Sequence, residues 1–223
     1  MSDNNHDDLE IAVFPIPACV CFPFGVMPLH VFEPRYRSLI KDSVRLGRRI
    51  GISHTVKAIS SVKKNQTKAE ILNSNQDTYE AEKIFSAGFA EIETVTADGR
   101  MGVIIRMDGR YESVNEIQTL PYRIDRCRIF QDEKTTSTQS NELKLRVLKI
   151  LQSQLESSPA KIRALFESAK WDALPAEEFS FRIFSELRLE TKISQAILEM
   201  RSVDARLNSL LRILEENNRL SDF

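Results

Sequence analysis

A turn-rich apolar stretch, residues 22–36, constrains the fold more than any other part of the sequence. Pro23, Gly25, Pro28 and Pro34 interrupt a run of large apolar side chains there. Proline fixes φ and favours an extended residue before it, and glycine enters positive φ at little steric cost. This stretch must therefore fold as short apolar pieces held by tertiary packing. Pro34 suits the first turn of a helix, which we expect to run to about residue 46 and stop near Gly47.

Residues with period-two alternation and glycine or proline punctuation predict a largely β N-terminal half. The expected strands are residues 11–14, 19–22, 49–55, 89–95, 101–107, 110–114 and 122–130. The expected turns are residues 15–17, Asp98-Gly99 and Asp108-Gly109. A polar run within residues 57–83 is expected to form a long surface loop.

Beyond a polar segment the apolar period changes from two to between three and four, which predicts helices. The expected divisions are a disordered tail at 1–9, a β-barrel subdomain at 10–131, a linker at 132–141 and a helical subdomain at 142–223. Helices are expected around Leu143–Leu151 and Ile162–Phe166, then after Pro175 at N1, Thr191 as a cap and Ser202 as a cap. The last helix carries an apolar seam that either packs in its own bundle or forms a dimer contact: Met200, Val203, Leu207, Leu210 and Leu214.

Composition excludes several classes of protein. The 31 basic and 32 acidic residues give a net charge of −1, whereas nucleic-acid binders usually carry a basic surplus. The acidic N-terminus does not resemble a signal peptide, and no apolar run approaches the ~18 residues that span a bilayer. Three cysteines, an odd number, fit a reducing compartment. We expect a cytoplasmic protein without membrane contact.

Several motifs together resemble a known family. Residues 11–17, Phe22-Pro23 and residues 28–36 closely resemble the start of the Lon N-terminal domain, the substrate-recognition domain of an ATP-dependent protease. Weaker similarity continues through the strand that begins at Gly88 and through Gln195–Glu199 and Arg206-Leu207, so the resemblance covers about residues 11–216. It implies an α+β fold, a PUA-like β pseudo-barrel followed by a C-terminal α-helical bundle. Phe24 departs from the family pattern, which usually has a small residue there.

The sequence lacks the motifs of catalysis. It has neither a phosphate-binding Gly-x₄-Gly-Lys-Ser/Thr loop nor a Gly-x-Ser-x-Gly elbow. The resemblance therefore implies a stand-alone, non-catalytic Lon-type domain without ATPase or protease domains, and we expect no cofactor. Cys19-Val20-Cys21 places two thiols close together, but a zinc site needs about four ligands. We interpret this pair as part of the core and expect no metal.

The resemblance implies recognition of exposed apolar or extended polypeptide segments, with partners in a protease or chaperone system. A groove between the two halves or an open barrel edge would supply backbone pairing and apolar pockets. The candidate contact residues are Phe24, Met27, His30, Arg35 and Tyr36. Glu33 and Arg35 are expected to lock the corner between strand and helix, and the oligomeric state is expected to be a monomer or a weak homodimer.

An alternative function is RNA binding through the helix at residues 35–49, because the PUA folds that the Lon barrel resembles include RNA-binding proteins. This segment carries six basic residues: Arg35, Arg37, Lys41, Arg45, Arg48 and Arg49. The cluster lacks the repeated aromatic residues that stack on bases, and we prefer to interpret it as a solvated helix face. We therefore prefer polypeptide recognition and do not expect nucleic acid as a partner.

Overall fold

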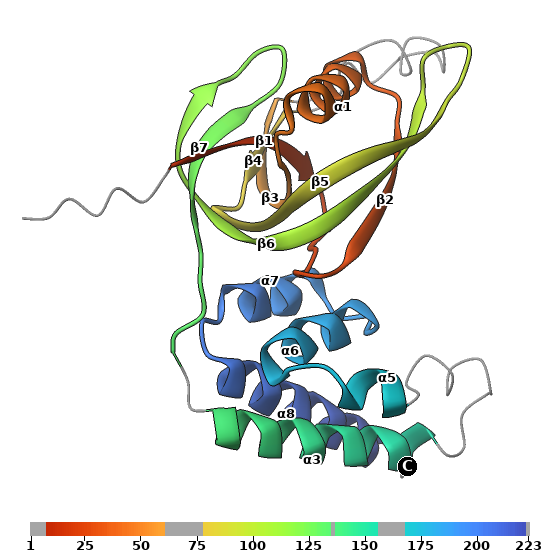
Figure 1. Cartoon of the computed structure of the whole chain (residues 1–223), viewed down its shortest axis with the longest axis vertical. Coiled ribbons are helices and arrows are strands. Elements are labelled where there is room, and N and C mark those ends of the chain that lie inside the picture. The colour runs from red at the N-terminus through yellow and green to blue at the C-terminus, as the bar shows by residue number, and fades with distance from the viewer. Residues whose placement is uncertain (1–7, 61–77, 135–136, 156–167, 222–223) are drawn as a thin grey trace, which may run out of the picture. The chain divides into compact units, whose positions relative to one another are not determined.

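The computed structural model describes residues 8–60, 78–134, 137–155 and 168–221. The chain divides into two compact units, residues 1–130 and residues 131–223. Within the described residues, the first contains all the strands and one helix, and the second is helical (Figure 1). No helix in the described ranges is long and apolar enough to cross a membrane.

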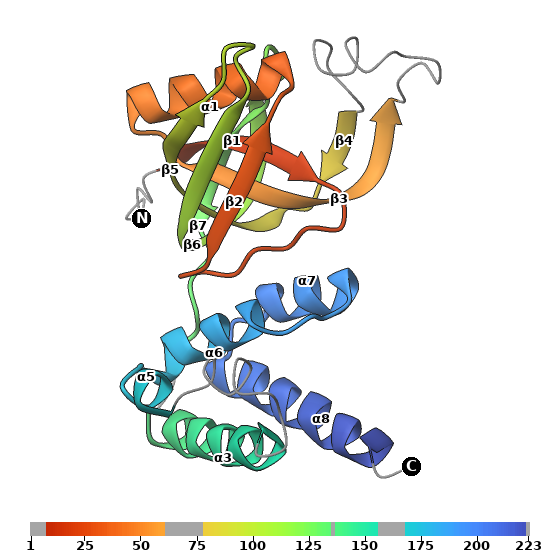
Figure 2. The ribbon, with the colours of Figure 1, turned by 90° about the vertical axis from the view of Figure 1, so that its right-hand side faces the viewer.

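The first unit, which we call the barrel unit, is built around a ring of five strands. Its elements are β1 (Leu9–Ile16), β2 (Val26–Val31), α1 (Pro34–Leu46), β3 (Ile50–Ser60), β4 (Thr78–Ala81), β5 (Ile84–Val95), β6 (Met101–Gln118) and β7 (Ile124–Ile129). The strands pair in the order β1-β7-β6-β5-β3, and β3 returns to β1, so the ring closes. The closing pair β1–β3 is parallel, whereas the other pairs are antiparallel. Outside the ring, β4 pairs with β3 and β2 with β6 (Figure 2).

Strand β1 is buried on both faces, which explains its continuous apolar run. Ala12 belongs to the larger core cluster, which also contains Leu39 and Ile40 of α1. Its neighbours Ile11 and Val13 belong to a second cluster, with Phe85 and Cys127 among others. Because successive side chains of a strand point to opposite faces, β1 separates the two cores.

Helix α1 forms where the local signals place it. Pro34 occupies its first turn, and the helix ends at Gly47, which is left-handed (φ 62°) and donates its N–H to the last carbonyls. Tyr36, Leu39 and Ile40 form its buried face. The predicted bounds of this helix are confirmed, as is the common core face of Ile50 and Ile52.

Four predictions for the barrel unit are wrong. Residues 19–22 do not form a strand, because Ala18 (φ 53°) and Phe24 (φ 64°) adopt left-handed backbone on either side; the strand is β2 instead. The expected loop at 57–83 contains the end of β3 and all of β4, which pair through their backbones; residues 61–77 lie outside the described residues. At the N-terminus, Leu9 of the expected tail belongs to β1, and residues 1–7 are outside the description.

The fourth error concerns Asp108-Gly109, which is a β-bulge within the 18-residue strand β6 and not a turn. Gly109 pairs with Ala87 and Met107 with Gly88, so Asp108 is the extra residue. The Asp108 carboxylate accepts hydrogen bonds from Arg49 Nε (2.8 Å) and from the Tyr111 hydroxyl (2.9 Å). A Cβ on Gly88 would lie 1.7 Å from the carbonyl oxygen of Arg106, so only glycine fits beside this bulge.

The helical unit contains α3 (Ser137–Leu155), α5 (Ser168–Asp172), α6 (Ala176–Ser185), α7 (Thr191–Glu199) and α8 (Val203–Ser221). Helix α3 begins inside the expected linker, because Ser140 faces the core and donates a hydrogen bond to Asp204 (2.5 Å). Pro175 is the N-cap of α6 and Thr191 the first residue of α7, each one position from its prediction. Ser202 caps α8 as predicted, accepting from the N–H of Ala205 (3.2 Å). The helix expected around Ile162–Phe166 falls outside the described residues.

The apolar seam of α8 packs inside its own unit. Its members from Val203 onward are all buried, and α8 contacts α3 and α6. This burial favours the bundle interpretation of the seam over a dimer contact.

A buried ion pair links α8, the last helix of the helical unit, to Asp132 near the start of the unit. The Arg206 side chain is 0% exposed, and two of its nitrogens donate hydrogen bonds to the Asp132 carboxylate (2.7 and 2.5 Å). Its Nε donates to Ser180 (3.0 Å), and its guanidinium lies 3.9 Å from the ring centre of Phe181. Asp132 was expected in a linker; it is instead a fixed part of the helical core.

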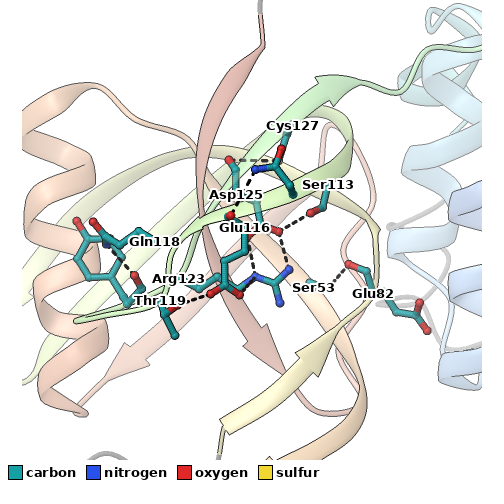
Figure 3. A network of polar contacts seen from close by, with 11 residues as sticks. Ser53, Glu82, Ser113, Glu116, Gln118, Thr119, Arg123, Asp125 and Cys127 are labelled. Atoms are coloured by element: carbon teal, nitrogen blue, oxygen red, sulfur yellow. Dashed lines mark hydrogen bonds and ion pairs between the residues drawn. The ribbon is translucent and has the colours of Figure 1, made fainter.

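The barrel unit holds a second buried carboxylate, Asp125, at the start of β7. Arg123 donates to both of its oxygens (2.7 and 2.6 Å), and Ser113 donates from β6 (2.5 Å) (Figure 3). Glu116 lies 3.6 Å from Arg123 on its more exposed side. This network fixes β7 against β6 at the point where the chain leaves the Leu120–Pro121 cis peptide.

Candidate functional site

The candidate residues of β2 lie on its two opposite faces. Val26, Pro28 and His30 are exposed on one face, whereas Met27 and Leu29 pack against the larger core cluster. Met27 therefore supports β2 from beneath, and His30 is available at the surface. Phe24, just before the strand, is 40% exposed.

A depression of about 330 Å³ lies at the corner where β1, β2 and α1 meet, and we call it the corner depression. It is lined by residues 14–17, residues 29–33, Arg35 and Tyr36. It brings together three of the five predicted site residues, namely His30, Arg35 and Tyr36, and does not include Phe24 or Met27. Most of its lining is apolar, and its volume is at the small end of the range of ligand pockets.

Two stacked rings and an ion pair shape the corner depression. Phe14 and Tyr36 stack with ring centres 3.9 Å apart, and the Arg35 guanidinium lies 4.6 Å from the Tyr36 ring centre. Glu33 accepts from Nε and from an Nη of Arg35, each at 3.0 Å. The two charged side chains are each 12% exposed. The ion pair thus joins the residue before α1 to its first turn, as the sequence predicted for this corner.

The backbone at Phe24 is unusual. Its φ of 64° is left-handed, a conformation that bulky residues rarely adopt and that costs about 1–2 kcal/mol. Two backbone hydrogen bonds hold it to β6, from Phe24 N–H to Met107 and from Met107 N–H to Gly25, both 3.0 Å. Glycine at this position would avoid the strain, because it has no Cβ atom.

The basic segment at residues 35–49 is largely neutralised by its own surroundings. Arg45 contacts Asp42 (3.0 Å), Arg48 contacts Glu10 (3.2 Å) and Arg49 contacts Asp108 (2.8 Å). Arg37 donates to the carbonyl of Asp98 (3.1 Å), which fixes the β5–β6 hairpin. Charges compensated in this way give a weak phosphate surface, so the RNA alternative is not favoured.

Sequence reasoning did not include Phe14, Pro17 and Phe32, which also line the corner depression. Phe14 was predicted as a strand residue, and nothing local indicates that it stacks on Tyr36, 22 positions away. Among the side chains that the structure describes, no group of three His, Cys, Asp or Glu residues could hold a metal ion.

The chain is similar to proteins of one family. The model of the ATP-dependent protease La (LON) substrate-binding domain matches residues 10–216. The N-terminal domain of Mycobacterium avium complex Lon protease has 14% identity and a TM-score of 0.64, over 92% of this chain and 98% of that chain. A Lon N-terminal domain protein from Xanthomonas campestris has 17% identity and a TM-score of 0.58, over 91% and 97%. No curated protein matches. At these identities the structural likeness establishes the fold, so the expected α+β architecture is confirmed.

Proposed function

Because the chain belongs to the family of Lon substrate-binding domains, we propose that its barrel unit binds exposed apolar segments of other polypeptides without catalysing a reaction. The family itself supports a substrate-binding role. The observation that carries the finer proposal is the corner depression, an apolar hollow built largely from residues of the family-defining stretch.

The corner depression suits an apolar side chain. The stacked rings of Phe14 and Tyr36 are part of its lining, and an aromatic side chain that packs against such a ring gains about 0.5–1.5 kcal/mol beyond area burial. A volume of about 330 Å³ holds only one or two large side chains. The proposed ligand is therefore a short apolar anchor within an extended segment, and not a folded surface.

The rim of the corner depression adds polarity. His30 lies exposed on the outer face of β2, and the Glu33–Arg35 pair lies beside Tyr36. Such groups can orient the backbone of an extended peptide while the apolar anchor supplies most of the affinity. Phe24 is an additional candidate contact at the other end of β2, where a strained backbone holds a large ring at the surface.

The test is fluorescence anisotropy with a labelled, permanently unfolded protein and matched variants of β2. His30→Asp adds a carboxylate to the depression and should weaken binding about ten-fold, equivalent to about 1.4 kcal/mol. Val26→Asp is the control, because Val26 is 54% exposed on the same face of the same strand but does not line the depression. Its affinity should stay within about two-fold of wild type, and binding should persist at high salt.

The outcomes separate the two ends of β2. Loss of affinity in Val26→Asp alone would move the site to the Phe24 end and overturn the assignment to the corner depression. Phe24→Asn then becomes decisive, since asparagine tolerates the left-handed backbone while removing the ring. If wild type binds but no variant changes the affinity, the assignment of the site to β2 and the corner depression is wrong. If wild type binds no unfolded probe, the proposed function is wrong.

A further inference from the structure

Two cysteines in the connection between β1 and β2 are not used by the proposed function. Cys19 and Cys21 are both reduced and both partly exposed, and their side chains pack against the larger core cluster. The Cys21 thiol donates a hydrogen bond to the sulfur of Cys19. The two sulfur atoms are therefore neighbours within one short segment.

The backbone around the pair is held in place. The carbonyl of Cys21 accepts a hydrogen bond from the Ser86 hydroxyl (2.7 Å), and the next residue, Phe22, is buried. On the other side, Ala18 has a left-handed backbone (φ 53°). Both thiols are thus presented by an anchored, irregular segment and not by a mobile tail.

The two thiols differ chemically. The hydrogen bond from Cys21 lowers the pKa of Cys19, although burial opposes the shift. The same hydrogen bond, together with burial, raises the pKa of Cys21. The thiolate is the nucleophile in disulfide exchange, so Cys19 is the sulfur that attacks first.

The third cysteine provides an internal contrast. Cys127 is fully buried in β7, and burial raises its pKa to about 12. A buried thiol of this kind is unreactive. All three residues carry the same thiol group. If Cys19 and Cys21 react with a disulfide and Cys127 does not, the difference therefore arises from their surroundings in the folded protein.

We propose that Cys19 and Cys21 form a reversible dithiol–disulfide couple that is oxidised by small-molecule disulfides. The Cys19 thiolate attacks one sulfur of the oxidant, forms a mixed disulfide and releases one thiolate. That step removes the negative charge at Cys19, so Cys21 loses its proton more easily and attacks the Cys19 sulfur. The second thiolate leaves, and the protein has lost two electrons and two protons in total, while the oxidant has become two thiols.

A disulfide between residues two apart is easily reduced. It closes a very short loop, so it gains little from restricting the unfolded chain, and its geometry is strained. Strained disulfides are the labile ones. The couple is therefore suited to respond to redox conditions and not to act as a permanent staple.

The first experiment treats the folded protein with oxidised glutathione, alkylates the remaining thiols under denaturing conditions and digests it with trypsin. The first basic residue of the sequence is Arg35, so Cys19 and Cys21 lie in one peptide, residues 1–35, and Cys127 lies in another. We expect the 1–35 peptide to be about 2 Da lighter, without alkylation or glutathione, and to recover its two thiols with dithiothreitol. Cys127 should be alkylated. A persistent glutathione adduct in wild type, or an unmodified dithiol, would overturn the proposal.

Two serine variants test the order of events. Cys21→Ser should accumulate glutathione on Cys19, because no second thiol resolves the adduct. Cys19→Ser should acquire glutathione at Cys21 at least about five-fold more slowly. In urea the two variants should react at equal rates, which shows that the difference arises from the fold. Equal rates in the folded variants would refute the assignment of Cys19 as the attacking thiol. None of these readouts involves peptide binding, so they stand or fall independently of the proposed function.

Discussion

The corner depression and the core of the helical unit contain the same three chemical groups in different surroundings. In each, an arginine pairs with a carboxylate and lies over an aromatic ring: Arg35 with Glu33 and Tyr36, and Arg206 with Asp132 and Phe181. The Arg206 side chain is completely buried and its partner Asp132 is 21% exposed, whereas Arg35 and Glu33 are each 12% exposed in the lining of a surface hollow, so the contrast lies in the arginines.

The difference teaches what burial does to one set of side chains. Removing Asp132 would leave the Arg206 charge buried without a partner, so we expect this pair to matter for the stability of the helical unit. The pair at the corner depression is reachable from solvent, so it contributes less to stability and can take part in recognition. Four variants, with expected effects from large to small, test this contrast.

Asp132→Ala should have the largest effect, a loss of about 3–5 kcal/mol in the unfolding free energy of the helical unit, because Arg206 remains buried without its counter-charge. The single tryptophan, Trp171, is buried in this unit, so its fluorescence during urea unfolding measures the effect. The control is Glu215→Ala, whose pair with Arg146 is exposed and should contribute less than about 1 kcal/mol. Equal effects of the two variants would contradict the role of burial.

Arg123→Ala tests whether a buried ion pair also contributes strongly to stability in the barrel unit, or only in the helical unit. Asp125 in the barrel unit is fully buried, and the variant removes its main charge partner. We expect a loss of about 2–3 kcal/mol, less than for Asp132→Ala because Arg123 is partly exposed and Ser113 still donates to Asp125. Amide hydrogen exchange of β6 and β7 should become faster. Unchanged protection there would mean that the barrel unit does not depend on its buried pair.

Unlike the two previous variants, Glu33→Gln should change stability little and should change binding. The variant keeps the shape of the corner depression but removes one negative charge, so the rim becomes more positive. The unfolding free energy should fall by less than about 1 kcal/mol. A probe with acidic residues beside its apolar segment should bind about three-fold more tightly, whereas a probe with basic residues there should not. A uniform loss of affinity for both probes would indicate that Glu33 acts through structure alone.

Asp42→Asn removes one partner of an exposed ion pair and should have the smallest effect on stability. Hydrogen bonds from Arg45, first, and from Tyr122 lower the pKa of Asp42. A lowered pKa in the folded state gives stability above the pKa of the unfolded chain, about 3.9, and this stability is lost as the pH falls through the folded value. Urea midpoints should therefore differ slightly between wild type and variant at pH 7 and converge near pH 2. A difference that grows in acid would have the wrong sign.

The predictions from sequence succeeded where the determinants are local. Pro34 and Gly47 define both ends of α1 within the helix itself, and Ser202 caps α8 through a residue three positions later. They failed where the determinant is distant. Asp108-Gly109 is a bulge and not a turn because Gly88, on the neighbouring strand, lets the backbone approach closely.

For the candidate site too, the sequence predicted what depends on local residues and missed what depends on distant ones. The family-defining stretch led to His30, Arg35 and Tyr36, which meet at the corner depression. It could not indicate that Met27 turns inward, because the position of β2 was not recognised and its alternation was therefore not used. The role of Asp132 depends on Arg206, 74 positions away, and a polar residue in a polar segment gives no local sign of such a partner.

Closure of the ring through β1 has a consequence for the order in which the protein is made. Strand β1 is synthesised first, yet its antiparallel partner β7 is the last strand of the unit to be synthesised, with Ala12 pairing with Ile124. Chains emerge from the ribosome N-terminus first, so β3 can pair with residues 12–16 early, but the edge of residues 9–12 that pairs with β7 stays unpaired until residues 124–127 have been added. During that time the nascent barrel displays an extended apolar segment of the same kind that we propose the finished barrel binds.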